Sequence, residues 1–192
     1  EYVRQVVNTE ANSAADNPLF FGEENEYFAA GNFHGQNIGM AADFLCIAMS
    51  EVANLSERHT NRLMNPVLSG LPDFLVEGNG LNSGLMVAQY TAAALVSENK
   101  VLSHPASVDS ISVSADQEDH VSMGPIAVRK CGEILRNVRA VLAIEMMSAA
   151  QAVEFHGGRR LGKGTAAAYD VIRTKVAPLK NDRVLHPDIE AI

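Results

Sequence analysis

The sequence predicts an all-α fold, a bundle of long helices joined by extended connecting loops, and three observations lead to that prediction. Apolar residues make up 47% of the chain, with Ala, Leu, Val and Met prominent among them, and these residues suit helices. Aromatic residues are scarce and Trp is absent, unlike the composition of a sheet sandwich. Long segments also repeat apolar residues at a spacing of three and then four positions, the period of an amphipathic helix. We expect residues 1–192 to form a single helical domain.

The first predicted elements are a short helix and an aromatic loop. Residues 1–15 are weakly helical, and this helix ends at Asp16-Asn17-Pro18, because proline disfavours helical angles in the residue before it. A loop or hairpin-like stretch over residues 19–35 follows. Loops often carry functional sites, but aromatic rings in a loop more often pin it to the core, and we favour that structural role. The rings concerned are Phe20, Phe21, Tyr27, Phe28 and Phe33.

Three long helices and one shorter helix are expected after this loop, at residues 36–64, 82–102, 121–156 and 163–177. The first repeats apolar residues along one face, which is typical of a helix buried in a bundle, and Asn65-Pro66 ends it. The face consists of Ile38, Ala41, Leu45, Ala48, Val52 and Leu55.

The ends of the last two helices follow from proline and glycine. Gly124-Pro125 falls in the first turns of the helix at 121–156, where proline is tolerated, and Gly157-Gly158 ends this helix. Pro178 stops the final helix.

Composition and apolar patterning also limit the possible partners. Helices this apolar need neighbours, so we expect a helical oligomer, a dimer or tetramer even for this chain alone. The net charge of −8 argues against nucleic acid or an anionic membrane as a partner, and no uninterrupted apolar run reaches transmembrane length. Cys46 and Cys131 lie in apolar helical stretches. They predict two buried free thiols in a reducing compartment, and we expect a cytoplasmic protein.

A polar cluster at Ser114–Gly124, SADQEDHVSMG, is the main candidate site. Asp116, Glu118, Asp119 and His120 carry possible metal ligands, but neighbouring residues on a helix point in different directions, so we expect no metal site. A helix start explains the acidity, because Asp116 would cap the helix and Glu118 and Asp119 would lie in its first turn. A carboxylate in a partly dry helix N-terminus can also serve as an acid, a base or a cation-binding group, so the structural and functional interpretations are compatible.

Several segments coincide, in order, with one protein family. They are ADNPLF (15–20), GNFHG (31–35), SGLPDFLVEGNGLNSGLMVAQYTAAAL (69–95), SENKVLSHPASVDS (97–110) and QEDHVSMG (117–124). On these segments the chain resembles the C-terminal half of the histidine ammonia-lyases, within the wider aromatic amino-acid ammonia-lyase and aminomutase family. The resemblance covers nearly the whole chain. It implies a mostly helical homotetramer and a carbon–nitrogen lyase of histidine catabolism, which eliminates ammonia from L-histidine to give trans-urocanate.

The resemblance also implies roles for single residues. Phe33 matches the family phenylalanine that lines the pocket next to the electrophile, and Glu118 matches the glutamate that faces the substrate imidazole. The phenylalanine lyases carry glutamine at that position. A carboxylate can hold an imidazole N–H by a charge-assisted hydrogen bond, whereas a phenyl ring offers no donor. Glu118 can also help to move a proton, and Gln117, Asp119 and His120 are expected to position it.

The family's electrophile, a methylidene-imidazolone, forms from an internal Ala-Ser-Gly. The 192 residues contain no such tripeptide. We expect the electrophile-bearing N-terminal half to be absent from this chain, together with the catalytic tyrosines upstream, and we expect the isolated chain to be inactive. Two alternatives stay open: a tyrosine or phenylalanine ammonia-lyase or aminomutase on the same fold, and a non-catalytic helical oligomerisation module.

Overall fold

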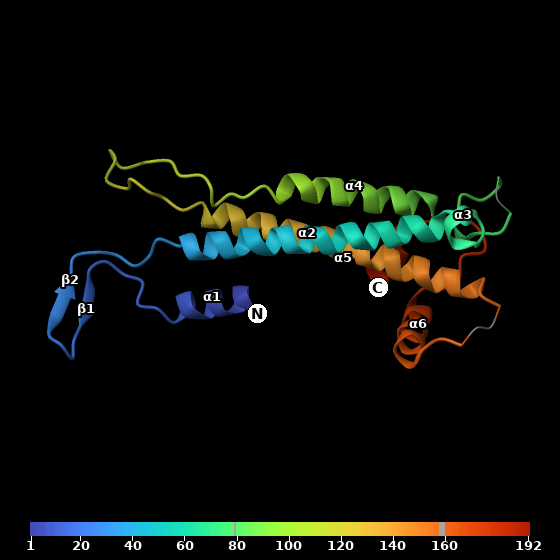
Figure 1. Cartoon of the computed structure of the whole chain (residues 1–192), viewed down its shortest axis with the longest axis horizontal. Helices are drawn as coiled ribbons and strands as arrows, with labels where there is room; N and C mark the ends of the chain where they lie inside the picture. Colours follow the sequence, from blue (N-terminus) through green and yellow to red (C-terminus); the bar gives the residue numbers. More distant parts are fainter. Residues whose placement is uncertain (79, 158–159) are drawn as a thin grey trace. The chain divides into compact units, whose positions relative to one another are not determined.

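The described part of the chain is mostly helical, which confirms the all-α prediction (Figure 1). A computed structural model describes residues 1–78, 80–157 and 160–192. The longest elements are α2 (Gln36–Met64) and α5 (Gly124–Glu154). The only departure from helix among the described elements is one small two-stranded hairpin.

The described residues form two compact units. The first contains Glu1–Ala48 and Leu102–Ile134, and the second contains Met49–Val101 and Leu135–Ile192. Both α2 and α5 therefore contribute residues to each unit, because each helix includes a boundary between them.

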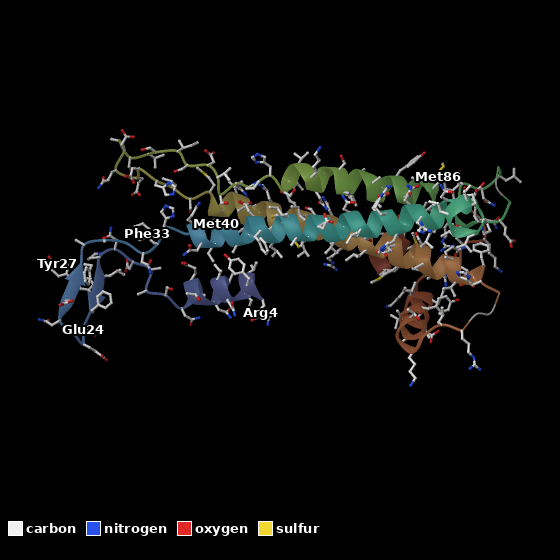
Figure 2. The ribbon with its side chains drawn as sticks, viewed as in Figure 1. Arg4, Glu24, Tyr27, Phe33, Met40 and Met86 are labelled. Carbon is white, nitrogen blue, oxygen red and sulfur yellow. The ribbon has the colours of Figure 1, made fainter. Side chains whose placement is uncertain are left out.

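The first unit begins with α1 (Tyr2–Ala11) and a hairpin of β1 (Leu19–Phe21) and β2 (Glu26–Phe28). The strands pair antiparallel, with Phe20 opposite Tyr27. Figure 1 shows the hairpin leading into α2 through a short connection. That connection contains the candidate residue Phe33, which Figure 2 labels before the start of α2.

The aromatic rings of the hairpin do not pack into the core of the described chain, so the prediction that they pin this loop is wrong. Phe20 is 75% exposed and Tyr27 is 67% exposed. Strand pairing instead sets the rings beside each other, with centroids 6.4 Å apart for Phe20 and Tyr27 and 5.5 Å apart for Phe21 and Phe28. The rings therefore stabilise the hairpin itself.

The beginnings of α2 and α5 approach each other closely at two glycines. A Cβ added at Gly39 would lie 3.3 Å from the Cα of Gly124, so a side chain at Gly39 would push the two backbones apart. Gly39 and Gly124 are both buried. This contact sets the spacing between the two segments that lead from the candidate loops into the helices.

The second unit is a helical core. It contains the rest of α2 and α5, with α3 (Pro66–Ser69), the short 3₁₀ helix η1 (Asp73–Leu75), α4 (Met86–Leu102), α6 (Lys163–Lys175) and α7 (His186–Ala191). Side chains of large volume are fully buried here, which supplies most of the hydrophobic stabilisation. They include Leu75, Val76, Leu85, Val141, Ile144 and Val176.

Hydrogen bonds connect the helices of this second unit. Ser56 on α2 donates to the Val141 carbonyl of α5 at 3.5 Å, and His59 pairs with Glu145 at 2.7 Å. Asn137 on α5 donates to the Asn99 side chain of α4 at 3.0 Å. These side-chain contacts thus connect α2, α4 and α5 with one another.

The prediction of 36–64 agrees with α2, whereas the other predicted helices are longer than the observed ones. α1 ends at Ala11. The side chains of Asn12 and Ser13 turn back and donate hydrogen bonds to the carbonyls of Asn8 and Thr9 in its last turns. α6 ends at Lys175. α5 begins at Gly124 and ends at Glu154, and Gly157 just beyond has a left-handed φ of 61°; Gly158 lies outside the described residues.

The late start of α4 at Met86, rather than at residue 82, has a cause far away in the sequence. The Asp182 carboxylate accepts hydrogen bonds from the main-chain N–H groups of Ser83 and Gly84, both at 2.8 Å. Gly84 has a φ of 57°, which a helix does not allow. The residues just before Met86 are therefore bound to Asp182 and do not continue the helix.

By length and composition alone, α2 is the one helix in the described chain that is able to cross a membrane. The same helix buries Asp43, Glu57 and Thr60 within the protein, at 4% exposure or less. Groups of this kind are expensive in a bilayer unless other protein segments cover them. The length and composition of α2 are thus also those of a core helix in a bundle.

Candidate functional site

The candidate residues of the polar cluster lie on a tight turn in the first unit. Val113 and Glu118 form an antiparallel bridge, with main-chain N–O distances of 3.1 and 3.3 Å. Between them, Ser114, Ala115 and Asp116 have φ values of 55°, 53° and 66°. Such left-handed angles are uncommon outside glycine. The chain therefore reverses within a few residues, and Glu118 sits where it returns.

The interpretation of this cluster as a helix start is wrong. α5 begins only at Gly124, so Asp116 does not cap it and Glu118 lies outside its first turn. Asp116 instead accepts a hydrogen bond from the Ser112 hydroxyl at 2.7 Å, which stabilises the turn. Asp tolerates left-handed angles better than most residues, and this was the one local sign of the turn.

The second candidate residue, Phe33, depends on a glycine. A Cβ added at Gly31 would lie 1.9 Å from a carbon of the Phe33 ring, so the ring occupies the space that a side chain at Gly31 would need. Asn32 anchors the same loop, because its side chain donates to the Ala14 carbonyl at 3.1 Å. Glycine at position 31 thus leaves room for the Phe33 ring, which stays 56% exposed.

His34 joins two segments of the chain. One is the Phe33 loop, residues 31–35, and the other is residues 114–123, which contain the Glu118 turn. The Nε2 of His34 lies 2.8 Å from the carbonyl oxygen of His120, and because a carbonyl only accepts, Nε2 carries the proton. The two imidazole rings stack with centroids 4.9 Å apart and planes 19° apart. The Ser122 hydroxyl donates to the His34 carbonyl at 2.6 Å. Segments distant in the sequence therefore meet on one surface.

A buried carboxylate anchors the loop that leads toward the turn. Asp43 on α2 is 3% exposed and accepts the Ser107 main-chain N–H at 2.7 Å. Lys130 on α5 lies 3.9 Å from Asp43 and also donates to the His104 carbonyl. Gln36 donates to the Ser107 carbonyl at 2.8 Å. Because a buried charge requires such partners, these contacts hold the loop against both helices.

The Glu118 carboxylate is exposed and makes no hydrogen bond to any described residue. The side chains of Gln117 and Asp119 are exposed as well, and the structure describes no hydrogen bond from either to Glu118. His120 contributes its carbonyl and its ring to the contact with His34. The oxygens of Glu118 are therefore free to accept hydrogen bonds from a bound molecule, while its main chain is fixed by the Val113 bridge.

The described residues do not enclose this site. Neither Phe33 nor Glu118 lines the cavity of about 480 Å³ in the same unit. Its lining consists of His104, Pro105, Ala106, Val108, Asp109, Met123, Ile126 and Lys130. Within the described ranges, no group of three or more His, Cys, Asp or Glu side chains is placed to hold a metal ion. The site is thus one open surface formed by two loops.

Neither Cys46 nor Cys131 forms a disulfide, as expected, but only Cys46 is fully buried and Cys131 is half-buried. Burial raises the pKa of the Cys46 thiol to about 12, and the neighbouring Cys131 and the Asp43 carboxylate act in the same direction. Cys46 is therefore a protonated thiol at neutral pH and no nucleophile.

Comparison with known proteins gives consistent matches along the whole chain. The aromatic amino acid lyase family matches residues 1–174. Histidine ammonia-lyase of Alkaliphilus oremlandii is 60% identical over 189 residues, which are 98% of this chain and 37% of that protein. Histidine ammonia-lyase of Symbiobacterium thermophilum is 58% identical over 192 residues, which are 100% of this chain and 38% of that protein. The chain thus spans well under half the length of these curated relatives.

Solved structures show the same fold over the same extent. Histidine ammonia-lyase from Trypanosoma cruzi superposes with a TM-score of 0.95 at 46% identity, over 99% of this chain and 38% of that one. Tyrosine aminomutase from Streptomyces globisporus superposes with a TM-score of 0.94 at 44% identity, over 99% of this chain and 36% of that one. Because proteins with different named activities share this fold, side chains must decide the substrate.

Proposed function

The chain belongs to the aromatic amino acid lyase family, and from this premise we propose that it forms part of a histidine ammonia-lyase. The complete enzyme would eliminate ammonia from L-histidine and release trans-urocanate. The observation that carries the proposal is the identity of 60% to a histidine ammonia-lyase along nearly the whole chain, including the loops of the candidate site.

Glu118 is the proposed substrate-binding and catalytic residue of this chain. Its carboxylate is exposed, lacks a hydrogen bond within the described chain and stands on a turn that its main chain holds in place. Such a group can accept the N–H of a substrate imidazole in a charge-assisted hydrogen bond. It can also take up or return a proton at that ring. A phenyl or phenol side chain has no N–H donor there, which would favour histidine as the substrate.

Phe33 is the proposed apolar wall of the same pocket. Its ring is held by contact with the position of Gly31, and His34 next to it links the loop to the Glu118 segment. An aromatic wall excludes water and restricts the orientations of a flat substrate ring. Phe33 and Glu118 would therefore contact different sides of one bound amino acid.

The family uses a methylidene-imidazolone group, but the residues of this chain do not fit its formation, because Ala-Ser-Gly occurs nowhere in the sequence. We place the group in a part of the enzyme outside these 192 residues and assign no step through it to this chain. The isolated chain is expected to have no ammonia-lyase activity. Formation of urocanate by the isolated chain would contradict this assignment.

We also propose that the complete enzyme is a cytoplasmic homotetramer. The supporting feature is a row of exposed apolar side chains on one side of α2, which water solvates poorly. The row consists of Met40, Phe44, Ile47, Val52 and Leu55, each about half exposed. Cys46 and Cys131 form no disulfide, which agrees with a reducing compartment.

The experiment is to incubate the full-length protein with L-histidine and to follow the ultraviolet absorbance of urocanate. L-tyrosine and L-phenylalanine serve as parallel substrates, because the similarity to a tyrosine aminomutase supports an alternative function on the same fold. Urocanate formation at a rate well above the parallel reactions is expected. Turnover of tyrosine or phenylalanine without turnover of histidine would establish the alternative and reject the proposal.

A further inference from the structure

We propose that His34 is a positioning residue, which holds the Glu118 turn in register with the Phe33 loop through its contacts with His120 and Ser122. The inference rests on the proposed function, because it assigns a task to His34 in presenting the substrate-binding carboxylate. Neither histidine is placed in contact with the substrate.

The hydrogen bonds that the structure describes between residues 31–35 and 114–123 all use His34. Its ring donates to the His120 carbonyl at 2.8 Å, and its own carbonyl accepts from the Ser122 hydroxyl at 2.6 Å. The face of its ring also stacks on the His120 ring at 4.9 Å. One residue therefore contacts the turn segment through its main chain, its ring nitrogen and its ring face.

The other contacts of the Glu118 turn are local. The Val113–Glu118 bridge and the Ser112–Asp116 hydrogen bond both close the turn on itself, so they fix its internal shape. The main-chain N–H of Val121 donates to the nearby Ser110 hydroxyl, at 2.9 Å. Without His34, the turn would keep its shape but would be free to move as a body relative to Phe33.

Such a motion matters for catalysis because the two residues must act on one substrate. Glu118 lies shortly before His120 in the chain, and Phe33 directly precedes His34. A displacement at the His34–His120 contact is therefore transmitted to both side chains. Misplacement of a binding group by about 1 Å can lower a rate by roughly 100-fold.

The geometry suggests a matched pair of substitutions in the full-length protein. The amide nitrogen of Gln reaches about as far as the Nε2 of histidine, whereas Asn carries the same chemical group on a shorter side chain. His34→Gln is expected to stay within about two-fold of the wild-type kcat/KM for L-histidine, since the hydrogen bond is kept. His34→Asn and His34→Ala are expected to lose roughly ten-fold, mainly through a raised KM.

A substitution at His120 separates the two ring contacts. The acceptor at this residue is its main-chain oxygen, so His120→Ala keeps the hydrogen bond and removes only the stack. We expect a loss of roughly two- to three-fold, smaller than for His34→Asn. A larger loss for His120→Ala than for His34→Asn would reject the hydrogen bond as the main link.

A double-substitution cycle tests whether His34 acts through Glu118. In a Glu118→Gln background the carboxylate is gone, so a further His34→Ala change is expected to lower kcat/KM by less than about two-fold. An equal ten-fold loss in both backgrounds would overturn the proposal, because His34 would then act independently of Glu118. Equal activities of the His34→Gln and His34→Asn enzymes would overturn it as well.

Hydrogen–deuterium exchange separates this inference from the proposed function. Peptides covering residues 117–123 are expected to exchange faster in His34→Asn than in wild type, and at the wild-type rate in His34→Gln. The Gln and Asn pair also serves where the alanine variant fails to fold. If the wild-type enzyme makes no urocanate, the proposed function fails, and the exchange data still decide whether His34 holds the turn. Unchanged exchange in His34→Asn would overturn the link itself.

Discussion

Two polar side chains, Gln151 in the second unit and Glu118 in the first, differ in how protein partners use their hydrogen-bonding capacity. Gln151 is 3% exposed and donates to the carbonyls of Leu75 and Leu179 at 3.0 and 2.9 Å, while it accepts the Leu179 N–H at 2.9 Å. Glu118 is exposed and its carboxylate has no described hydrogen bond. Gln151 is saturated by protein partners and fixes the fold, whereas the Glu118 carboxylate keeps hydrogen-bonding capacity that we propose a substrate uses.

The surroundings of the two residues differ in the same way. Gln151 connects α5 with the segments at Leu75 and Leu179, which are buried. Glu118 stands on an exposed turn that polar contacts hold. Substitution at Gln151 should therefore affect stability, and substitution in the Glu118 region should affect activity with little change in stability.

The largest expected effect on stability is that of Gln151→Ala. Removing the amide leaves two buried carbonyls and one buried N–H without partners, so the free energy of unfolding should fall by about 3 kcal/mol. Urea or thermal unfolding of the full-length protein measures this change. Gln5→Ala, on an exposed residue of α1, is the matched control and should lie within about 0.5 kcal/mol of wild type. Equal stabilities of the two variants would show that the Gln151 hydrogen bonds do not stabilise the fold.

A smaller effect, on activity, is expected for Gly31→Ala. The new Cβ would lie 1.9 Å from the Phe33 ring, so the ring must leave its position. We expect kcat/KM for L-histidine to fall roughly ten-fold while the melting temperature changes little. Gly22→Ala is the control in the same part of the chain, because a Cβ there meets nothing within 4 Å. Wild-type kinetics in Gly31→Ala would show that the ring position is unimportant.

The smallest effect on stability is expected from ionisation of Cys46, because burial raises the pKa of this thiol from its ordinary value of 9.0 to about 12. Above pH 9 the unfolded chain loses this proton first, so ionisation favours unfolding. The free energy of unfolding should fall as pH rises from 9 toward 12, by at most about 1.4 kcal/mol per pH unit. Unfolding of wild type and Cys46→Ala at pH 8 and 10 compares the slopes. Identical slopes would show that the Cys46 thiol does not have a raised pKa in the folded protein.

The sequence predicted the parts of the molecule that local patterns determine. α2 agrees with the prediction of 36–64 because its apolar spacing extends over many turns and Asn65-Pro66 ends it. The late start of α4 could not be predicted in this way, because it depends on Asp182, far along the chain. A hairpin was one of two options for residues 19–35, and the pattern could not choose it over a loop, since each of its strands has only three residues.

The candidate site shows the same limit. Motif resemblance proposed Phe33 and Glu118 as site residues, but the acidic residue pattern predicted a helix start where the structure has a left-handed turn. The residues Ser114, Ala115 and Asp116 adopt positive φ without any glycine to signal it. The His34–His120 contact was also missed, because it depends on two loops that meet only in the folded chain.

We propose that the carboxylate of Glu118, which has no described hydrogen bond, selects an imidazole substrate. The most direct test is Glu118→Gln in the full-length protein, with kcat/KM measured for L-histidine and for L-phenylalanine. We expect a fall of roughly 100-fold or more with L-histidine and no loss with L-phenylalanine, because only the imidazole donates to the carboxylate. An unchanged rate with L-histidine, or an equal loss with both substrates, would contradict it.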